Sequence, residues 1–104
     1  MMINEIDVQE LSRLRESGES HTLVDIRSPM EILQGSIANA ENIPMNQIPE
    51  HIAKLKELDK VVLYCRSGAR SAHACAFLAS QGLDNVINLK GGIIAWSQSG
   101  QPVA

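Results

Sequence analysis

The residues of this chain best suited to chemistry lie together in one segment, which reads Cys65-Arg66-Ser67-Gly68-Ala69-Arg70-Ser71. It follows the apolar run Val61–Tyr64, which is typical of a buried strand, and precedes an alanine-rich stretch that is typical of a helix. Open α/β sheets bind ligands at such strand-to-helix loops. We therefore interpret Cys65 as a candidate nucleophile on a ligand-binding loop.

The composition of this loop predicts an anion site. Gly68 and its small neighbours Ser67 and Ala69 allow consecutive backbone N–H groups to converge, and the following helix adds its positive N-terminal end. The same field should lower the pKa of the Cys65 thiol and favour its nucleophilic thiolate. The alternative is that Cys65 is a small apolar residue at the end of a buried strand. Two arginines and a glycine around it favour the functional interpretation.

At these residues the chain resembles the rhodanese-like sulfurtransferases, whose active loop runs Cys-x-x-Gly-x-Arg-Ser between a strand and a helix. Two further segments resemble the signatures of that family. The first is Leu23-Val24-Asp25-Ile26-Arg27 with Pro29, Glu31, Gly35, Ile37, Ala40, Asn42, Ile43 and Pro44, and the closing one is Gly91-Gly92-Ile93-Ile94-Ala95-Trp96. Together they span nearly the whole chain.

The resemblance implies a double displacement. The Cys65 thiolate takes the outer sulfur of a donor such as thiosulfate, releases sulfite and becomes a persulfide. A thiophilic acceptor then collects that sulfur: cyanide in vitro, and a thioredoxin-like dithiol or another protein thiol in the cell. No cofactor is expected, and the covalent relay divides one transfer into two easier steps.

Loop length helps to choose among functions of this fold. Four residues separate Cys65 from Arg70, whereas cysteine phosphatases and the related rhodanese-fold phosphatases carry five. In the family, the shorter loop implies a pocket for a transferable sulfur, and the longer one a pocket for a phosphoryl or arsenyl group. The count favours a sulfurtransferase. A phosphatase or arsenate reductase, and a non-enzymatic binding or regulatory module, remain alternatives.

The other loop residues, and two residues upstream, have expected supporting roles. Arg70 matches the family's arginine and is expected to brace the loop or bind the donor. Arg66 occupies a variable position, where it is either a solvated surface charge or a cation that draws in a dianionic donor. The expected substrate-binding loop is Arg66, Ser67, Gly68, Ala69, Arg70 and Ser71. By resemblance, Asp25 and Arg27 shape the loop from behind, at the same edge of the sheet.

Other chemistry-bearing side chains are left out of the expected site. Cys75 falls on a stripe of small residues, Ala72, Cys75, Ala76 and Ala79, which predicts a buried packing face rather than a resolving thiol. His21, His51 and His73 have no partner in the sequence that suggests a metal site or a general base, and we expect them to be exposed. Trp96 is expected in the core.

Strand-like and helix-like segments alternate and predict a parallel α/β sheet. Strands are expected at Glu5–Asp7, Thr22–Ile26, Glu41–Ile43, Val61–Tyr64 and Asn85–Leu89. Helices are expected around Val8, Leu11 and Leu14, then at Pro29–Leu33, Ile48–Leu55, Ser71–Gln81 and Ile93–Ser99. By resemblance, this becomes a three-layer rhodanese-like fold: a five-stranded, mainly parallel sheet with helices on both faces.

Composition bounds the remaining possibilities. The 104 residues, 44% of them hydrophobic, fit one domain over residues 1–104 with an adequate core. A formal charge of −3 with scattered basic residues offers no stripe for nucleic acid and no basic amphipathic helix for a membrane. The start of the chain lacks a signal-peptide pattern, and the two cysteines suit a reducing compartment, so we expect a cytoplasmic protein.

Overall fold

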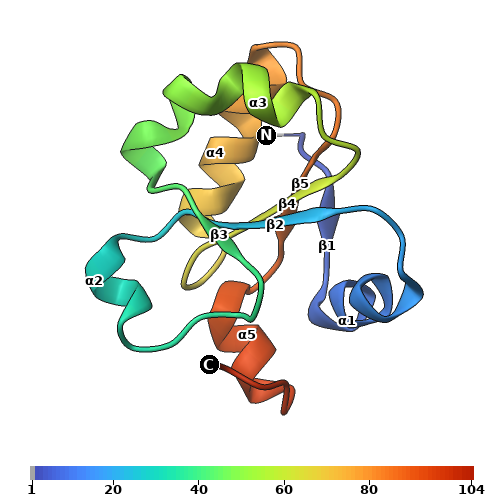
Figure 1. The fold of residues 1–104 in the computed structure, drawn as a ribbon, viewed down its shortest axis with the longest axis vertical. Coiled ribbons are helices and arrows are strands. Elements are labelled where there is room, and N and C mark those ends of the chain that lie inside the picture. Colours follow the sequence, from blue (N-terminus) through green and yellow to red (C-terminus); the bar gives the residue numbers. More distant parts are fainter. Residues whose placement is uncertain (1) are drawn as a thin grey trace.

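The structure is a computed structural model that describes residues 2–104. Within that range, five strands form one parallel sheet in the order β1-β5-β4-β2-β3. The strands are β1 (Glu5–Ile6), β2 (Thr22–Asp25), β3 (Glu41–Asn42), β4 (Val61–Tyr64) and β5 (Val86–Leu89) (Figure 1). β4 lies between β2 and β5 and is buried along its whole length. The predicted parallel α/β sheet is confirmed.

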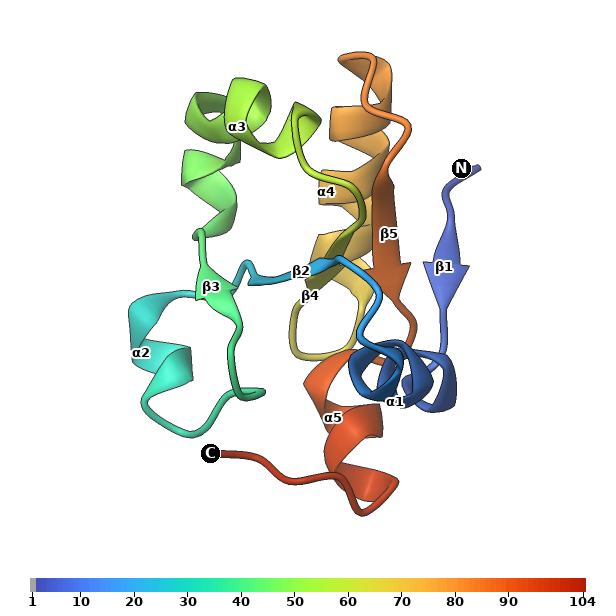
Figure 2. The same ribbon diagram turned by 45° about the vertical axis from the view of Figure 1, so that its right-hand side comes forward.

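Helices cover both faces of this sheet. α1 (Val8–Ser17) and α5 (Gly92–Gln98) lie on one face, and α3 (Ile52–Lys56) and α4 (Ala69–Ser80) lie on the other (Figure 2). The short α2 (Pro29–Ile32) lies beside the edge strand β3, and a 3₁₀ helix (Met45–His51) leads into α3. The expected three layers are present.

Two hydrophobic cores result from the alternation of side chains along the strands. Val61 and Leu63 of β4 belong to the core beneath α3 and α4. Val62 and Tyr64 belong to the core beneath α1 and α5, which also contains Trp96 as predicted. Because β4 is buried on both faces, its sequence is continuously apolar rather than alternating.

The helix after the cysteine loop differs from the prediction in two respects. α4 begins at Ala69, two residues before the predicted Ser71, because Gly68 adopts φ +96° and forms the N-cap. Its buried stripe consists of Ser71, Ala74, Cys75 and Leu78. Of the predicted stripe, Cys75 is buried, Ala72 and Ala76 are half-buried, and Ala79 is exposed. As a result, Ser71 turns inward, toward Cys65, instead of only starting the helix.

Candidate active site

The loop that carries Cys65 starts where β4 ends and stops where α4 begins. Its turn depends on Gly68, whose φ of +96° is rarely adopted by residues with a side chain. A Cβ atom at this position would also lie 3.1 Å from the backbone nitrogen of Gly91 and 3.3 Å from the carbonyl oxygen of Leu89. Gly68 thus permits both the turn and the close packing of the loop against the segment after β5.

The sulfur of Cys65 lies among hydrogen-bond donors. Its Sγ accepts the backbone N–H of Gly68 at 3.1 Å and lies 3.4 Å from the Ser71 hydroxyl oxygen. Burial raises the pKa of the Cys65 thiol, but the Ser71 hydroxyl and the amides of Ser71, Gly68 and Ser67 together lower it by more. The pKa therefore lies below its ordinary value, and the loop favours the thiolate.

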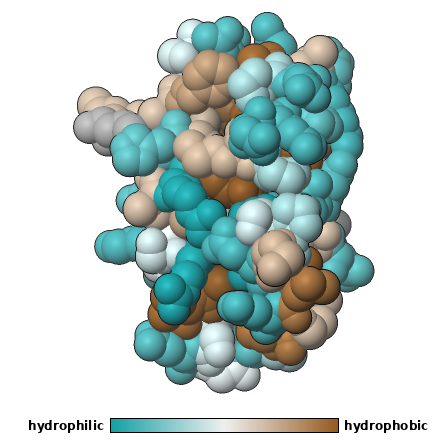
Figure 3. Space-filling view, turned by 90° about the vertical axis from the view of Figure 1, so that its left-hand side faces the viewer, coloured by the Kyte–Doolittle hydropathy of each residue, from teal (hydrophilic) through white to brown (hydrophobic). Residues whose placement is uncertain are grey.

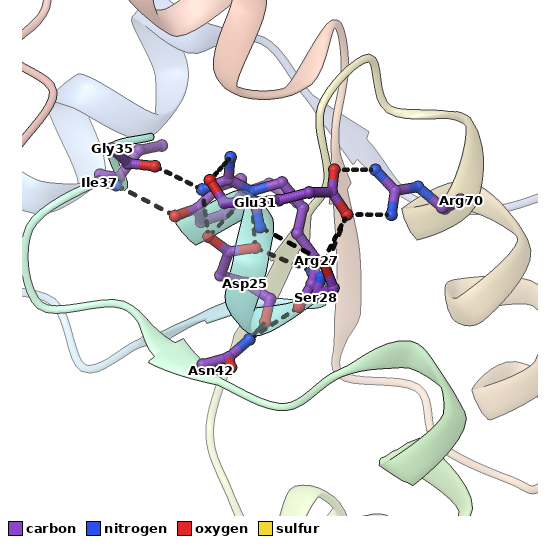
Figure 4. A network of polar contacts seen from close by, with 9 residues as sticks. Asp25, Arg27, Ser28, Glu31, Gly35, Ile37, Asn42 and Arg70 are labelled. Carbon is purple, nitrogen blue, oxygen red and sulfur yellow. Dashed lines mark hydrogen bonds and ion pairs between the residues drawn. The ribbon is translucent and has the colours of Figure 1, made fainter. Parts of the chain in front are cut away.

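The guanidinium of Arg70, in the first turn of α4, is paired with Glu31 of α2. Its two terminal nitrogens donate to the two carboxylate oxygens of Glu31 at 2.8 and 2.7 Å, a bidentate pair (Figure 4). Hydrogen bonds from Arg70, and then from Ser28 at the start of α2, lower the pKa of Glu31 to about 2 despite the opposing effect of burial. The pair ties the first turn of α4 to α2, which favours the bracing role for Arg70.

Asp25 and Arg27 reach the same edge of the sheet as Cys65 and form a buried ion pair of 2.8 Å (Figure 4). Arg27 also donates to the carbonyl oxygens of Gly35 at 2.7 Å and Glu31 at 3.5 Å, and its guanidinium lies 5.8 Å from the centre of the Tyr64 ring. Their link to the cysteine loop therefore passes through α2 and Tyr64. They fix the segment that holds Arg70.

The N-terminus of α5 supports the cysteine loop from below. The backbone N–H groups of Ile93 and Ile94 donate to the carbonyl oxygens of Cys65 at 3.0 Å and Arg66 at 3.1 Å. Gly92, with φ +59°, makes this contact possible, because a Cβ there would lie 2.4 Å from the Arg66 oxygen and 2.5 Å from the Cys65 oxygen. In the sequence, the two consecutive glycines Gly91 and Gly92 are the pattern that could have indicated this close packing.

Arg66 is exposed at the mouth of the loop. It lines a hollow of about 280 Å³ together with Arg27, Glu31 and Ile94. The face that carries α2 shows apolar patches within a largely polar surface (Figure 3), and Met30 of α2 is 75% exposed. Arg66 is therefore an exposed cation directly after Cys65, and the hollow that it lines does not include Cys65 itself.

The remaining candidates lie away from this chemistry. Cys75 is 1% exposed, and burial, with a smaller effect of the Glu5 charge, raises its pKa to about 12. His73 is exposed as expected, whereas His21 and His51 are half-buried. Among residues 2–104, no group of three His, Cys, Asp or Glu side chains could hold a metal ion. Over the same range, no helix has the length and apolar character required to cross a membrane.

Two polar residues near the loop were missed by sequence reasoning as partners of the site. Glu31 was recognised only as part of a signature, and its pairing with Arg70 was not expected. Asn88 of β5 accepts a 2.5 Å hydrogen bond from Ser71 through Oδ1 and is 1% exposed. Asn88 is the one amide side chain within the apolar run Val86–Leu89. Because buried polar groups need hydrogen-bond partners, this pattern could have indicated a polar contact at this position.

The fold and the cysteine loop define the class of this protein. Residues 7–99 match the family model of the rhodanese-like domain, and the chain belongs to that family. A protein of Allochromatium vinosum named as a sulfurtransferase is 50% identical over 102 residues, covering 98% of this chain and 95% of the relative.

Solved structures show the same architecture. A rhodanese-related protein from Thermoplasma volcanium matches with a TM-score of 0.85 and 35% identity, covering 97% of each chain. A protein of unknown function from Rhodopseudomonas palustris, suggested to be a tyrosine phosphatase, matches with a TM-score of 0.91 and 29% identity. The latter match covers 98% of this chain and 85% of that one. The predicted rhodanese-like fold is confirmed.

Proposed function

We propose that this protein is a sulfurtransferase that moves a sulfane sulfur atom from thiosulfate, or a similar anionic donor, to a thiophilic acceptor through a persulfide on Cys65. The observation that carries the proposal is the position of Sγ, 3.1 Å from the Gly68 amide in a loop that lowers the pKa of the thiol. Membership of the rhodanese-like family and the relative named as a sulfurtransferase support it.

The first half-reaction forms the persulfide. The Cys65 thiolate attacks the outer sulfur of thiosulfate, a new Sγ–S bond forms, and the S–S bond of the donor breaks. Sulfite leaves with the electron pair of that bond. The negative charge now lies on the outer sulfur of the persulfide, where loop amides and the N-terminus of α4 stabilise it.

The second half-reaction returns the enzyme to its starting state. Cyanide in vitro, or the thiolate of a thioredoxin-like or other protein in the cell, attacks the outer sulfur. The electron pair of the Sγ–S bond returns to Sγ and restores the thiolate. Both steps balance without an added oxidant or reductant, as expected of a covalent group transfer.

The two loop arginines have different proposed roles. Arg66, exposed at the mouth, attracts the dianionic donor and speeds its encounter with the loop. Arg70 has both terminal nitrogens engaged by Glu31, so its proposed role is to hold the loop in place. Cys65 itself is only 1% exposed, which favours a donor that presents a narrow terminal atom such as the outer sulfur of thiosulfate.

Phosphatase activity is the second candidate, because one structural neighbour is suggested to be a tyrosine phosphatase. Two observations oppose it here. Four residues separate Cys65 from Arg70, one fewer than in the phosphatase loops described above. In addition, a phosphoryl group would need the guanidinium that Glu31 already engages.

Initial-rate kinetics test the proposal. Thiosulfate and cyanide are varied together, and a persulfide relay predicts parallel double-reciprocal lines, the signature of ping-pong kinetics. Intersecting lines would contradict a free persulfide intermediate. Turnover of an aryl phosphate or of arsenate without turnover of thiosulfate would favour the phosphatase or reductase, and turnover of none of them would favour a binding module.

A further inference from the structure

The buried hydroxyl of Ser71 has one proton and three acceptors within reach. Its Oγ lies 2.5 Å from Asn88 Oδ1, 3.3 Å from the Gly68 carbonyl oxygen and 3.4 Å from Cys65 Sγ. A hydroxyl donates one hydrogen bond at a time, so these acceptors compete for the same proton. The short contact to Asn88 shows that this residue is the favoured acceptor in the structure.

Glu5 fixes the direction of the Asn88 amide. The Nδ2 group of Asn88 donates to Glu5 Oε2 at 2.8 Å, and the two residues are direct neighbours in the register of β1 and β5. An ionised carboxylate can only accept hydrogen bonds, so the NH₂ group must face Glu5 and Oδ1 must face Ser71. Asn88 is only 1% exposed, so no solvent replaces the hydrogen bond from Ser71 if it is lost. Oδ1 would then be an unpaired acceptor in the interior, which is unfavourable.

We propose that Asn88 is a positioning residue that decides when Ser71 donates to Cys65. When Sγ is neutral, in the thiol or as the inner sulfur of a persulfide, the hydroxyl donates to Asn88 Oδ1. When Sγ is a thiolate, the hydroxyl turns to the charged sulfur and Oδ1 loses its donor. The role assigned to this switch in sulfur transfer rests on the function proposed above.

The consequence concerns the reactivity of the thiolate. The unpaired Oδ1 offsets part of the stabilisation that Ser71 gives to the charged sulfur. Cys65 therefore ionises less readily than the amides and a free hydroxyl would allow. A more basic thiolate is also the stronger nucleophile, and the best attacking thiol has a pKa near the ambient pH. Asn88 would thus balance the fraction of thiolate against its nucleophilicity.

Charged and titratable side chains lie on the cysteine loop and on the elements around it. They are Glu5 of β1, Asp25 of β2 and Arg27 after it, Glu31 of α2, Tyr64 of β4, Arg66 of the loop, Arg70, His73 and Cys75 of α4, and Lys90 after β5. All of them remain in the variants proposed below. Asn88→Leu also removes the hydrogen bond to Glu5, and this loss is the same with and without the Ser71 hydroxyl. The difference between these two backgrounds therefore reports on the Ser71 hydroxyl and its acceptors.

The test is the pH dependence of Cys65 alkylation by iodoacetamide, followed by peptide mass spectrometry so that Cys75 is measured separately. Asn88→Leu removes the competing acceptor and keeps the branching of the side-chain heavy atoms, although its methyl groups are bulkier than the amide. It should lower the apparent pKa of Cys65 by about one unit, a tenfold change in the ionisation equilibrium. Ser71→Ala should raise that pKa. In the Ser71→Ala background, Asn88→Leu should have no further effect.

Dependence on Ser71 separates this proposal from a packing effect. An unchanged or higher pKa in Asn88→Leu would overturn it, and so would an equal shift with and without the Ser71 hydroxyl. Asn88→Ala also lacks the acceptor, carries the same prediction, and replaces the leucine variant if circular dichroism shows that the latter is unfolded. Because alkylation requires no sulfur donor, a failure of the proposed sulfur transfer would leave this result interpretable.

Discussion

Replacing Gly92 with alanine should destabilise the protein through the contact between α5 and the cysteine loop. The φ of +59° at this position costs roughly 1–2 kcal/mol for a residue with a Cβ atom. That Cβ would also lie 2.4 Å from the Arg66 oxygen and 2.5 Å from the Cys65 oxygen. Relieving the clash separates the two backbones and breaks the hydrogen bonds from Ile93 and Ile94.

Each of those two hydrogen bonds contributes about 0.5–1.5 kcal/mol to stability, so Gly92→Ala should cost about 2–5 kcal/mol in total. Gly100→Ala is the matched control. Gly100 has φ +86°, and nothing lies within 4 Å of its expected Cβ position. Gly100→Ala should therefore lower the free energy of unfolding only by the cost of a positive φ, roughly 1–2 kcal/mol.

Urea denaturation of the two variants measures the difference in the free energy of unfolding. The rate of Cys65 alkylation should change in Gly92→Ala and stay at the wild-type value in Gly100→Ala, because only Gly92 contacts the loop carbonyls. Equal destabilisation by the two substitutions would refute the reasoning. It would mean that the contact between α5 and the loop adds nothing beyond the cost of a positive φ.

Three further perturbations probe the surroundings of the loop. The pKa of Glu31 is lowered from 4.5 to about 2, so its ionised form stabilises the fold above about pH 4.5, and this contribution is lost as the pH falls toward 2. In a plot of melting temperature against pH, Glu31→Gln should therefore reduce the fall in melting temperature below about pH 4.5. An unchanged fall would contradict the pairing of Glu31 with Arg70. Arg70→Ala should lower kcat/KM for sulfur transfer by on the order of 10²-fold, because the loop is no longer held in position. Kinetics close to those of the wild type would contradict the bracing role of Arg70. Cys75→Ala should cost about 1 kcal/mol in urea denaturation and retain most activity, whereas loss of activity would make Cys75 a resolving thiol.

Local sequence patterns were sufficient for the parts of the fold that depend on neighbours along the chain. The continuous apolar run Val61–Tyr64 predicted a buried central strand, and its bounds are those observed. The turn at Gly68 and the accumulation of amides around Cys65 followed from residue types alone. The buried position of Cys75 was also predicted from its helical spacing, although Ala72 and Ala76 are only half-buried and Ala79 is exposed.

Pairings between distant segments could not be predicted in the same way. Glu31 and Arg70 are 39 residues apart, and Ser71 and Asn88 are 17 residues apart. Periodicity reports which face of an element is buried but not which polar side chain meets another across the fold. The predicted start of α4, at Ser71, was too late because it relied on serine being a common N-cap residue. In the structure Gly68 is the N-cap, with a positive φ, and the helix begins at Ala69.

Intact-protein mass spectrometry before and after thiosulfate tests the central claim most directly. The reduced wild-type protein should gain one sulfur atom that cyanide removes, and Cys75→Ala should behave in the same way. Cys65→Ser should gain none while keeping the wild-type circular dichroism spectrum. A folded, reduced wild-type protein that gains no sulfur, or a Cys65→Ser variant that gains it, would contradict a persulfide on Cys65.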